Sequence, residues 1–380
     1  MAATSRVGSI KRYFRCLKDP RVRGRTEHRL IDIIVIALCG VIANCDGWSD
    51  IIDFANSRCA WFKGFLMLPN GIPSHDTFER VFAKIDAAVF NRCCIAWLRD
   101  VSDLVGLGHL AIDGKTLRGS ASSELGPLHL VSAWATKANL SLGEVAVEGK
   151  SNEIKAIPEL LKLLDLKGAL VTIDAIGCQK AIAQQIVDKG GDYLLAVKAN
   201  QAHLLEDIQA TVTKALDGDL PKHQVATVTT TTEGHGRIEQ RTYTVVTNLD
   251  DLRDRKLWAG LTTVGMCLRE RTVNGKTTEE THYFIASGRL GARKAAKAMR
   301  GHWGIENNLH WQLDVHLGED RSRLQEPNAA RNFASMRKLA LCVLKRHPAQ
   351  KSIPRKRKLS AQNPDFLEEI LTGAAKVEKV

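Results

Sequence analysis

The stretch GALVTIDAIGCQKAIAQQIVDKGGDYLLAVKAN, residues 168–200, runs through a strand, a helix and a second strand. Its two apolar runs, at 169–175 and 192–200, are short and rich in aliphatic residues, which is typical of buried strands. Between them, residues 179–190 have helical spacing and end at a pair of glycines. Strands that alternate with a helix in this way predict an α/β fold.

The residues before this stretch extend the pattern. The three predicted strands and the predicted helix are GHLAIDG (108–114), HLVSAWATK (129–137), LSLGEVAVEG (140–149) and NEIKAIPELLKLLDL (152–166). The resulting order of three strands, a helix, a strand, a helix and a strand is that of a ribonuclease H-like core. We therefore predict such a catalytic core over residues 104–200 and 291–347.

Three other parts flank or interrupt this core. Residues 1–103 read as an all-α N-terminal domain, for which DNA binding and a purely structural or dimerising role are equally good interpretations. Residues 201–290 alternate Thr, Val and Tyr around Gly-containing turns, which predicts a β-rich insertion. Residues 348–380 form a basic C-terminal segment.

The net charge of +12 is concentrated in two segments. Residues 1–30 carry nine Lys and Arg against two acids, and residues 331–360 carry ten against none, so the other 320 residues carry a net −5. Basic ends on an acidic body fit a protein that binds a polyanion, and nucleic acid is the expected partner. The alternative is that the basic ends only aid solubility.

The cysteines and apolar runs bear on the compartment. Nine cysteines are scattered without a C-x-x-C spacing, which predicts reduced thiols in a cytoplasmic protein. The start MAATSRVGSIKRYFR lacks the apolar run of a secretory signal, and the apolar run at 30–43 is too short to cross a bilayer. We expect no membrane partner.

Three acids in separate segments stand out. Asp113 and Asp174 each end an apolar strand, and Glu306 lies in HWGIENNLHWQLDV, residues 302–315, where helical spacing gives it aromatic and histidine neighbours on one face. Carboxylates at these positions predict a site for Mg²⁺ or Mn²⁺. Two ions about 3.5–4 Å apart would suit an in-line displacement at phosphorus. Asp113 would bridge the two ions, and Asp174 and Glu306 would each complete the coordination shell of one ion.

Each of these residues also has a structural interpretation. An Asp at the end of a strand often only caps a turn or helix, and Glu306 is equally a surface acid of its helix. A zinc site from His302, Glu306 and His310 is disfavoured, because their spacing lacks the two-histidine pattern of a metalloprotease helix. We expect His302 to contact a phosphate or orient Glu306, whereas helix packing explains His310 equally well. Trp303 and Trp311 are expected in the core or at its rim.

Several cations lie where DNA phosphates would pass. Arg and Lys at such places position the DNA backbone and do not read its sequence, and each is equally an exposed cation with no role. The candidate DNA contacts are Lys115, Arg118, Lys198, Arg237, His302 and, in the basic C-terminal segment, Arg355, Lys356, Arg357 and Lys358.

Long motifs carry a family resemblance along nearly the whole chain. They are DPRVRGRTEHRLIDIIVIALCGVIA (19–43), LPNGIPSHDTFERVF (68–82), AIDGKTLRGS (111–120), HWGIENNLHWQLDVHLGEDRSR (302–323) and KRKLSAQNPDFLEEIL (356–371). The chain resembles the DDE transposases of bacterial insertion sequences, in the branch of the H-repeat-associated proteins. The resemblance implies a metal-binding triad of Asp113, Asp174 and Glu306 and cut-and-paste transposition. It also implies double-stranded transposon ends and target DNA as partners, a homodimer on paired ends, and nucleoid association in a bacterial cytoplasm.

The chain departs from the wider superfamily beside Glu306. Met299, His302 and Leu313 occupy the places where a Tyr, an Arg and a Lys accompany the final Glu, so the phosphate contacts of those residues are not expected here. Three functions remain open: an active transposase that cleaves DNA ends and transfers the strands, a catalytically inactive DNA-binding remnant, and a metal-dependent nuclease. Retention of all three acids favours the first.

Overall fold

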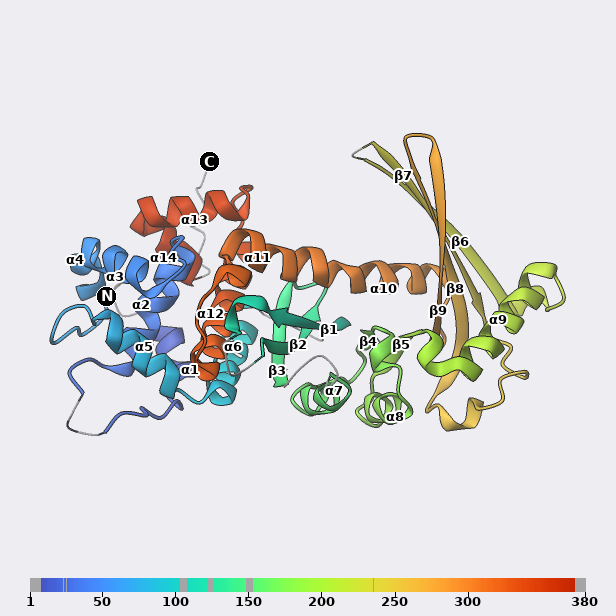
Figure 1. Ribbon diagram of the computed structural model, residues 1–380, viewed down its shortest axis with the longest axis horizontal. Coiled ribbons are helices and arrows are strands. Elements are labelled where there is room, and N and C mark those ends of the chain that lie inside the picture. Colours follow the sequence, from blue (N-terminus) through green and yellow to red (C-terminus); the bar gives the residue numbers. More distant parts are fainter. Residues whose placement is uncertain are drawn as a thin grey trace.

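The computed structural model describes residues 8–22, 24, 26–102, 108–121, 126–147, 153–234 and 236–372. The molecule is elongated (Figure 1). Helices from both ends of the chain lie on one side, a sheet with helices lies in the middle, and long hairpins lie on the other side. This arrangement places the predicted core between two parts that are far apart from each other.

The N-terminal part consists of helices in its described residues. They are α1 (Gly8–Phe14), α2 (Leu30–Ile42), α3 (Trp48–Ser57), α4 (Cys59–Lys63), α5 (His75–Lys84) and α6 (Ala87–Ser102). The predicted helix at 30–43 is α2, and it is buried along nearly its whole length. Its one acid, Asp32, accepts a hydrogen bond at Oδ2 from the backbone amide of Leu68 at 3.3 Å. Across the described parts of the chain, no helix combines the length and apolar character that a bilayer crossing needs.

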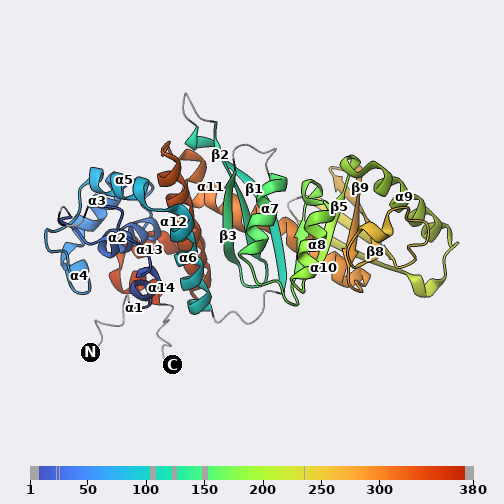
Figure 2. The ribbon, with the colours of Figure 1, turned by 90° about the horizontal axis from the view of Figure 1, so that it is seen from below.

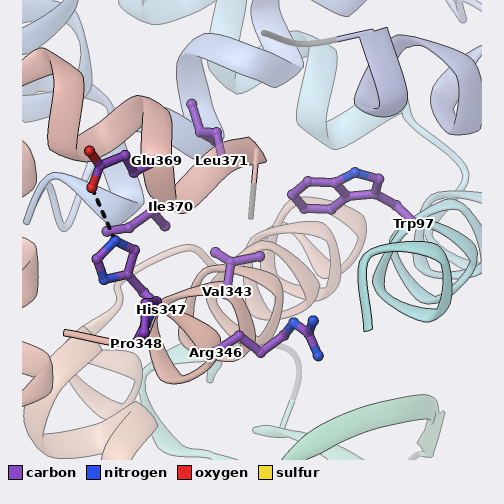
Figure 3. A pocket seen from close by; sticks show the side chains of 8 residues that line it. All are labelled: Trp97, Val343, Arg346, His347, Pro348, Glu369, Ile370 and Leu371. Atoms are coloured by element: carbon purple, nitrogen blue, oxygen red, sulfur yellow. Dashed lines mark hydrogen bonds and ion pairs between the residues drawn. The ribbon is translucent and has the colours of Figure 1, made fainter. Parts of the chain in front are cut away.

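The C-terminal helices pack into this helical part. They are α12 (Pro327–Arg346), α13 (Ile353–Gln362) and α14 (Pro364–Thr372). α12 is buried over most of its length and contacts α2, α5 and α6. Figure 3 shows a small pocket just beyond α12, where His347 Nε2 lies 3.4 Å from Glu369 Oε2 of α14. The predicted basic segment 348–380 is therefore folded onto the helical part over residues 348–372; residues 373–380 lie outside the described ranges.

The middle part contains the predicted order of strands and helices. Its elements are β1 (His109–Leu117), β2 (Leu128–Ala135), β3 (Leu140–Val147), α7 (Glu153–Lys162), β4 (Leu170–Ile173), α8 (Lys180–Asp188) and β5 (Asp192–Val197). β2 pairs antiparallel with β1 and β3, whereas β4 runs parallel to β1 and β5. The strand order β3-β2-β1-β4-β5 places the carboxyl end of β4, at Ile173, beside Ile112 in the middle of β1. The prediction that Asp113 ends its strand is wrong, because β1 continues to Leu117 through its pairing with β2.

The insertion continues the same sheet. It contains α9 (Ala202–Asp217), β6 (Val225–Gly234), β7 (Arg237–Val246), β8 (Leu261–Val273) and β9 (Lys276–Ser287). β9 pairs antiparallel with β5, and β8, β7 and β6 follow outward, so that the sheet has nine strands among the described residues. The predicted β-rich segment is thus an extension of the core sheet, and its hairpin ends project away from it (Figure 1).

A long helical segment returns the chain from the insertion across the sheet. It consists of α10 (Ala292–Ile305), a π-helical turn (Glu306–His310) and α11 (Trp311–Leu317). α10 contacts β7, β4 and β1, and its Ala292, Ala295 and Ala298 are buried in a cluster with Leu170 and Leu194. α7 and α8 cover the other face (Figure 2). The small side chains let α10 approach the sheet closely and carry Glu306 toward β1.

Candidate functional site

Asp113 and Asp174 lie side by side on neighbouring parallel strands. The β1–β4 register pairs Ile112 with Ile173, and each Asp is the next residue. Asp113 Oδ1 accepts a hydrogen bond from the amide of Gly114 at 2.9 Å. Asp174 Oδ1 accepts one from the amide of Ile176 at 3.2 Å and so also caps the following turn. The capping interpretation of Asp174 is thus realised, but it leaves the carboxylate next to Asp113.

The surroundings of both carboxyl groups disfavour their charged forms. Burial raises the pKa of Asp113 to about 7, and the negative charges of Asp174, Glu306 and Glu153 act in the same direction. Burial and then Glu153 raise the pKa of Asp174, while the cation of Lys198 opposes the shift. Closely spaced carboxylates of this kind are the hard oxygen donors that a divalent cation prefers. The donor set therefore fits Mg²⁺ or Mn²⁺.

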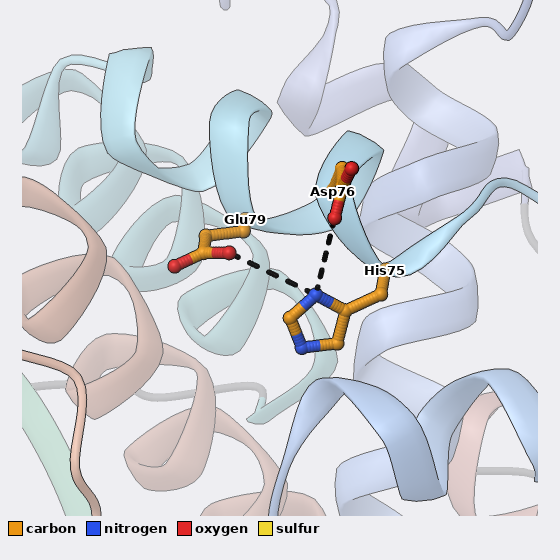
Figure 4. A group of neighbouring side chains, drawn as sticks. All are labelled: His75, Asp76 and Glu79. Carbon is orange, nitrogen blue, oxygen red and sulfur yellow. Dashed lines mark ion pairs between the residues drawn. The ribbon is translucent and has the colours of Figure 1, made fainter.

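Glu306 lies farther out than the two aspartates. It is exposed, at the first position of the π-helical turn. Within the described ranges, one group of three side chains has all its ligand atoms within 4.8 Å, and it is His75, Asp76 and Glu79 of α5 (Figure 4). That group is fully on the surface, where acids gather without a ligand. Asp113, Asp174 and Glu306 do not reach this spacing, although Glu306 is close enough to affect the pKa of Asp113.

The π-helical turn changes which residues share a face. Leu309 and Leu313 are fully buried, whereas Trp303 and Trp311 are 36% and 49% exposed. The predicted common face of Glu306 with its aromatic and histidine neighbours therefore divides: Glu306 and Trp303 are exposed while Leu309 and Leu313 are buried, because the extra residue of a π turn shifts the helical phase. π turns of this kind occur often at functional sites.

His310 faces Asp113 from this turn. Its Nδ1 lies 3.6 Å from Asp113 Oδ2, and its Nε2 is buried without a hydrogen-bond partner. Burial lowers the pKa of His310 to about 3, so the ring is neutral and does not form an ion pair with Asp113. The sequence predicted helix packing or zinc binding for His310. Its position beside Asp113 depends on the π turn, which local spacing did not predict.

His302 is occupied inside the protein. Its Nδ1 lies 3.1 Å from Thr172 Oγ1 on β4, and the same hydroxyl lies 2.9 Å from His109 Nε2 on β1. Burial lowers the pKa of both histidines to about 4. The prediction that His302 contacts a phosphate or orients Glu306 is therefore corrected, because the ring ties α10 to the sheet.

Lys115 is also occupied. Its ammonium group lies 2.5 Å from Glu319 Oε2 and also bonds Asp314, and its side chain is only 11% exposed. A lysine enclosed by two carboxylates is not available to DNA, so the predicted phosphate contact is corrected. Lys115 instead connects β1 to the residues that follow the π turn.

The remaining predicted cations divide by exposure. Arg118 is 83% exposed on its side chain, and Lys198 is exposed next to Asp174. Arg237 is exposed at the first residue of β7, in the hairpin that joins β6 to β7. Its neighbour in the turn, residue 235, lies outside the described ranges. Arg118 lies 3.8 Å from Asp320 and Arg237 lies 3.5 Å from Glu239, but all three cations are exposed to solvent and so can be reached by a polyanion.

The basic cluster on α13 divides in the same way. Arg355 and Lys358 are exposed. Lys356 is buried and donates to the carbonyls of Leu344 and His347 at 2.9 and 2.7 Å. Arg357 is buried and donates to the carbonyl of Val41. Lys356 and Arg357 are therefore corrected from DNA contacts to internal cations that hold α13 in place.

Sequence reasoning missed one acid entirely. Glu153 begins α7 and is buried near both aspartates. Its sequence signal was weak, since an acid in the first turn of a helix is ordinary. Its position after the third strand of the core, on a helix that packs on β2 and β3, is the feature that could have identified it.

Comparison with known proteins defines the class. The chain matches the family described as "Transposase DDE domain" over residues 106–343 and the one described as "DDE_Tnp_1-associated" over residues 11–98. The chain therefore belongs to the DDE transposase family.

Named relatives narrow the branch. The chain is 39% identical to "Putative transposase YncI" of Escherichia coli O157:H7, over 98% of this chain and 96% of that protein. It is 38% identical to "H repeat-associated putative transposase YhhI" of Escherichia coli (strain K12), over 94% and 96%. The resemblance to the H-repeat-associated branch is thus confirmed. A solved piggyBac transposase synaptic complex with hairpin DNA shares 11% identity and a TM-score of 0.45 over 100% of this chain and 84% of that one, too little to define the fold.

Proposed function

We propose that this chain is an active DDE transposase whose ribonuclease H-like core cleaves the DNA ends of an insertion sequence and joins them to target DNA. The observation that supports the proposal most is the juxtaposition of Asp113 and Asp174 on paired parallel strands, with the charge of Glu306 near Asp113. Mg²⁺ or Mn²⁺ is the cofactor that this donor set favours.

The residues of the site have separate tasks in this proposal. Asp113 and Asp174 would hold the cations, and Glu306 would complete the ligand set. Two ions held there would supply activation of an attacking oxygen and stabilisation of a departing one. The exposed Lys198 and Arg118 would hold phosphates of the reacting strand. One site would thus serve both steps, in which water releases a 3′-hydroxyl end and that hydroxyl attacks a target phosphate.

We assign binding of the transposon ends to the helical part. Two neighbouring hollows on α1, α5 and α6 share Lys84, and charge complementarity favours a DNA duplex there. Their cations are Arg12, Lys18, Arg21, Arg80, Lys84 and Arg92, beside the acids Asp86 and Glu27. Arg355 and Lys358 on α13 would add contacts to the same part of the molecule.

We further propose that two copies act together on paired ends. Each end needs one site for its cleavage, and joining both ends to one target requires two sites held side by side. Arg237 and the hairpins of the insertion would contact DNA beyond the active site.

The test uses the full-length protein, Mg²⁺ and a duplex that carries the element's own ends. Wild-type protein should produce nicked and joined products. Asp113→Asn, Asp174→Asn and Glu306→Gln should lose nearly all of them while they still bind the duplex. Asp217→Asn, which changes an exposed acid at the end of α9, should cut as wild type does.

Each alternative predicts a different result. A wild-type protein that binds the ends and never cuts them would identify a DNA-binding remnant. One relative, "Inactive transposase YbfQ" of Escherichia coli (strain K12), is 38% identical over 66 residues, which is the reason to test for this outcome. Cutting without joined products would identify a nuclease. Cutting that survives Asp113→Asn would reject the proposed cation site.

A further inference from the structure

The sulfur atoms of Cys16 and Cys93 are in contact. Their Sγ atoms lie 3.2 Å apart, although 77 positions separate the two residues in the sequence. Both cysteines are free thiols. Within the described ranges, no contact of this kind joins any two of the remaining cysteines. The fold thus brings one pair of thiols together that the scattered cysteine spacing did not predict.

The packing of α1 against α6 holds this contact in place. Phe14 at the end of α1 and Phe90 on α6 are both buried, and their rings meet edge to face with centroids 5.5 Å apart. Cys16 follows in the turn after α1, and Cys93 lies on α6. The sulfurs of a disulfide are about 2.05 Å apart, so those of Cys16 and Cys93 need to approach by only about 1 Å.

The two thiols differ in their access to solvent. Cys16 is exposed, whereas Cys93 is only 2% exposed. Burial, and then the hydrogen bond with Cys16, raises the pKa of Cys93 to about 12, so Cys93 is protonated at neutral pH. A small oxidant would therefore react with Cys16 first, and Cys93 would already lie beside the product. An exposed thiol next to a second thiol is the usual arrangement of redox-sensing cysteines.

We propose that Cys16 and Cys93 form an oxidisable dithiol, which a peroxide converts into a disulfide between α6 and the turn after α1 and which a dithiol reductant restores. The sulfur of Cys16 attacks one peroxide oxygen, the O–O bond breaks, and a sulfenic acid and water form. The sulfur of Cys93 then attacks that of Cys16, the S–O bond breaks, and the leaving hydroxide takes the proton of Cys93 to become water. The two thiols lose two electrons, and one peroxide becomes two waters.

The dithiol lies in the wall of a basic hollow. Cys16 and Cys93 line this hollow together with Arg12, Lys18 and Arg92. The hollow is one of the two to which binding of the transposon ends is assigned, so bound DNA would cover Cys16 and keep oxidants away from it. This consequence rests on the proposed function, whereas the dithiol itself does not.

Peptide mapping of the full-length protein tests the dithiol. The protein is reduced, freed of reductant, treated with hydrogen peroxide, alkylated and digested with trypsin. Because trypsin cuts after lysine and arginine, oxidation should link peptide 16–18 to peptide 93–99, and dithiothreitol should separate them. Peptide 93–99 also contains Cys94, so Cys94→Ser assigns the bond and should leave the linked peptide intact.

The other cysteine variants provide the contrast. Cys16→Ser and Cys93→Ser should both lose the linked peptide. Cys59→Ser, which replaces a partly exposed cysteine, is the matched control and should keep it. Sulfinic acid on Cys16 without a linked peptide would overturn the proposal, and so would a bond to Cys94 or a bond between two chains on a non-reducing gel. Cys16→Ser changes an exposed residue, so the contrast holds even if Cys93→Ser does not fold.

Protection by DNA tests the location separately. Reduced protein is alkylated with iodoacetamide in the presence of a duplex that carries the element's own ends. With about nine-tenths of the protein bound, alkylation of Cys16 should slow about tenfold, because only the free fraction reacts, and high salt should restore the rate. Unslowed alkylation of Cys16 in a DNA-bound protein would reject the hollow as the DNA site and leave the dithiol standing. Absence of the linked peptide would reject the dithiol whatever DNA does.

Discussion

Lys115, which lies two residues after Asp113 on β1, has its Nζ 2.5 Å from Glu319 Oε2. Glu319 is buried, and the positive charge of Lys115 contributes to holding its pKa below the usual range. The ion pair therefore joins β1, which carries Asp113, to the segment that follows Glu306 and α11. Its main effect should be on stability and on the geometry of the site.

Replacing Lys115 should destabilise the fold. Lys115→Met leaves Glu319 buried without its partner, so the free energy of unfolding should fall by about 3–5 kcal/mol. Lys198→Met, at an exposed position, should change it by less than about 0.5 kcal/mol. Urea unfolding measures both. A Lys115→Met protein as stable as wild type, with weaker DNA binding, would restore Lys115 as a phosphate contact.

The two kinds of cation on α13 should respond differently to neutralisation. Arg357→Met leaves the buried carbonyl of Val41 without the hydrogen bond that Arg357 donates to it, which should lower the free energy of unfolding by about 1–3 kcal/mol. Arg355→Gln with Lys358→Gln should leave stability unchanged and reduce the salt dependence of DNA binding, by about 0.9 in slope for each lost phosphate contact. Fluorescence anisotropy over a salt series measures the slope. An unchanged slope in the double variant would remove α13 from the DNA surface.

The histidine pair between β1, β4 and α10 should make the protein acid-sensitive. Burial lowers the pKa of His109 and of His302 from 6.5 to about 4, so the unfolded chain binds more protons between those values. Unfolding free energy should therefore fall as the pH drops from 6.5 toward 4, by roughly 2 kcal/mol per histidine at pH 5. Urea unfolding at pH 7 and pH 5 should show a smaller drop in His302→Gln than in wild type. His203→Gln, at an exposed position, should keep the full drop.

Gly119 should tolerate no side chain. A Cβ there would overlap the backbone carbonyl oxygen of Ser322 and lie 3.1 Å from that of Asp320, and backbone cannot move aside as a flexible side chain can. Gly119→Ala should cost about 1–3 kcal/mol of unfolding free energy. Gly126→Ala, which meets nothing within 4 Å, is the control. Equal stability of the two variants in thermal unfolding would show that the loop after β1 is not tightly seated on the segment after α11.

Local sequence patterns were sufficient to predict the helices and strands of the core and to identify Asp113 and Asp174 as neighbouring acids. The apolar runs and glycine pairs of 168–200 define β4, α8 and β5, because the period of buried residues is a property of the local sequence. Asp113 and Asp174 could be placed side by side because both follow apolar runs that the same core must pair, although β1 continues past Asp113 to Leu117. The β-rich insertion was predictable in type, but its attachment to β5 was not, because strand pairing is not encoded in a single segment.

Tertiary structure alone decided which charged side chains are free. Lys115 and Lys198 both follow apolar strand residues in the sequence. Lys115 nevertheless contacts partners 199 and 204 residues further along the chain, whereas Lys198 is exposed. Burial of a long side chain depends on what packs over it, which local spacing does not specify. The same reason hid His310, whose Nδ1 lies 3.6 Å from Asp113 Oδ2, and Glu153, whose charge raises the pKa of both aspartates. The sequence by itself determined the elements, the family and the two aspartates on neighbouring strands, while packing between distant segments determined which residues surround those acids.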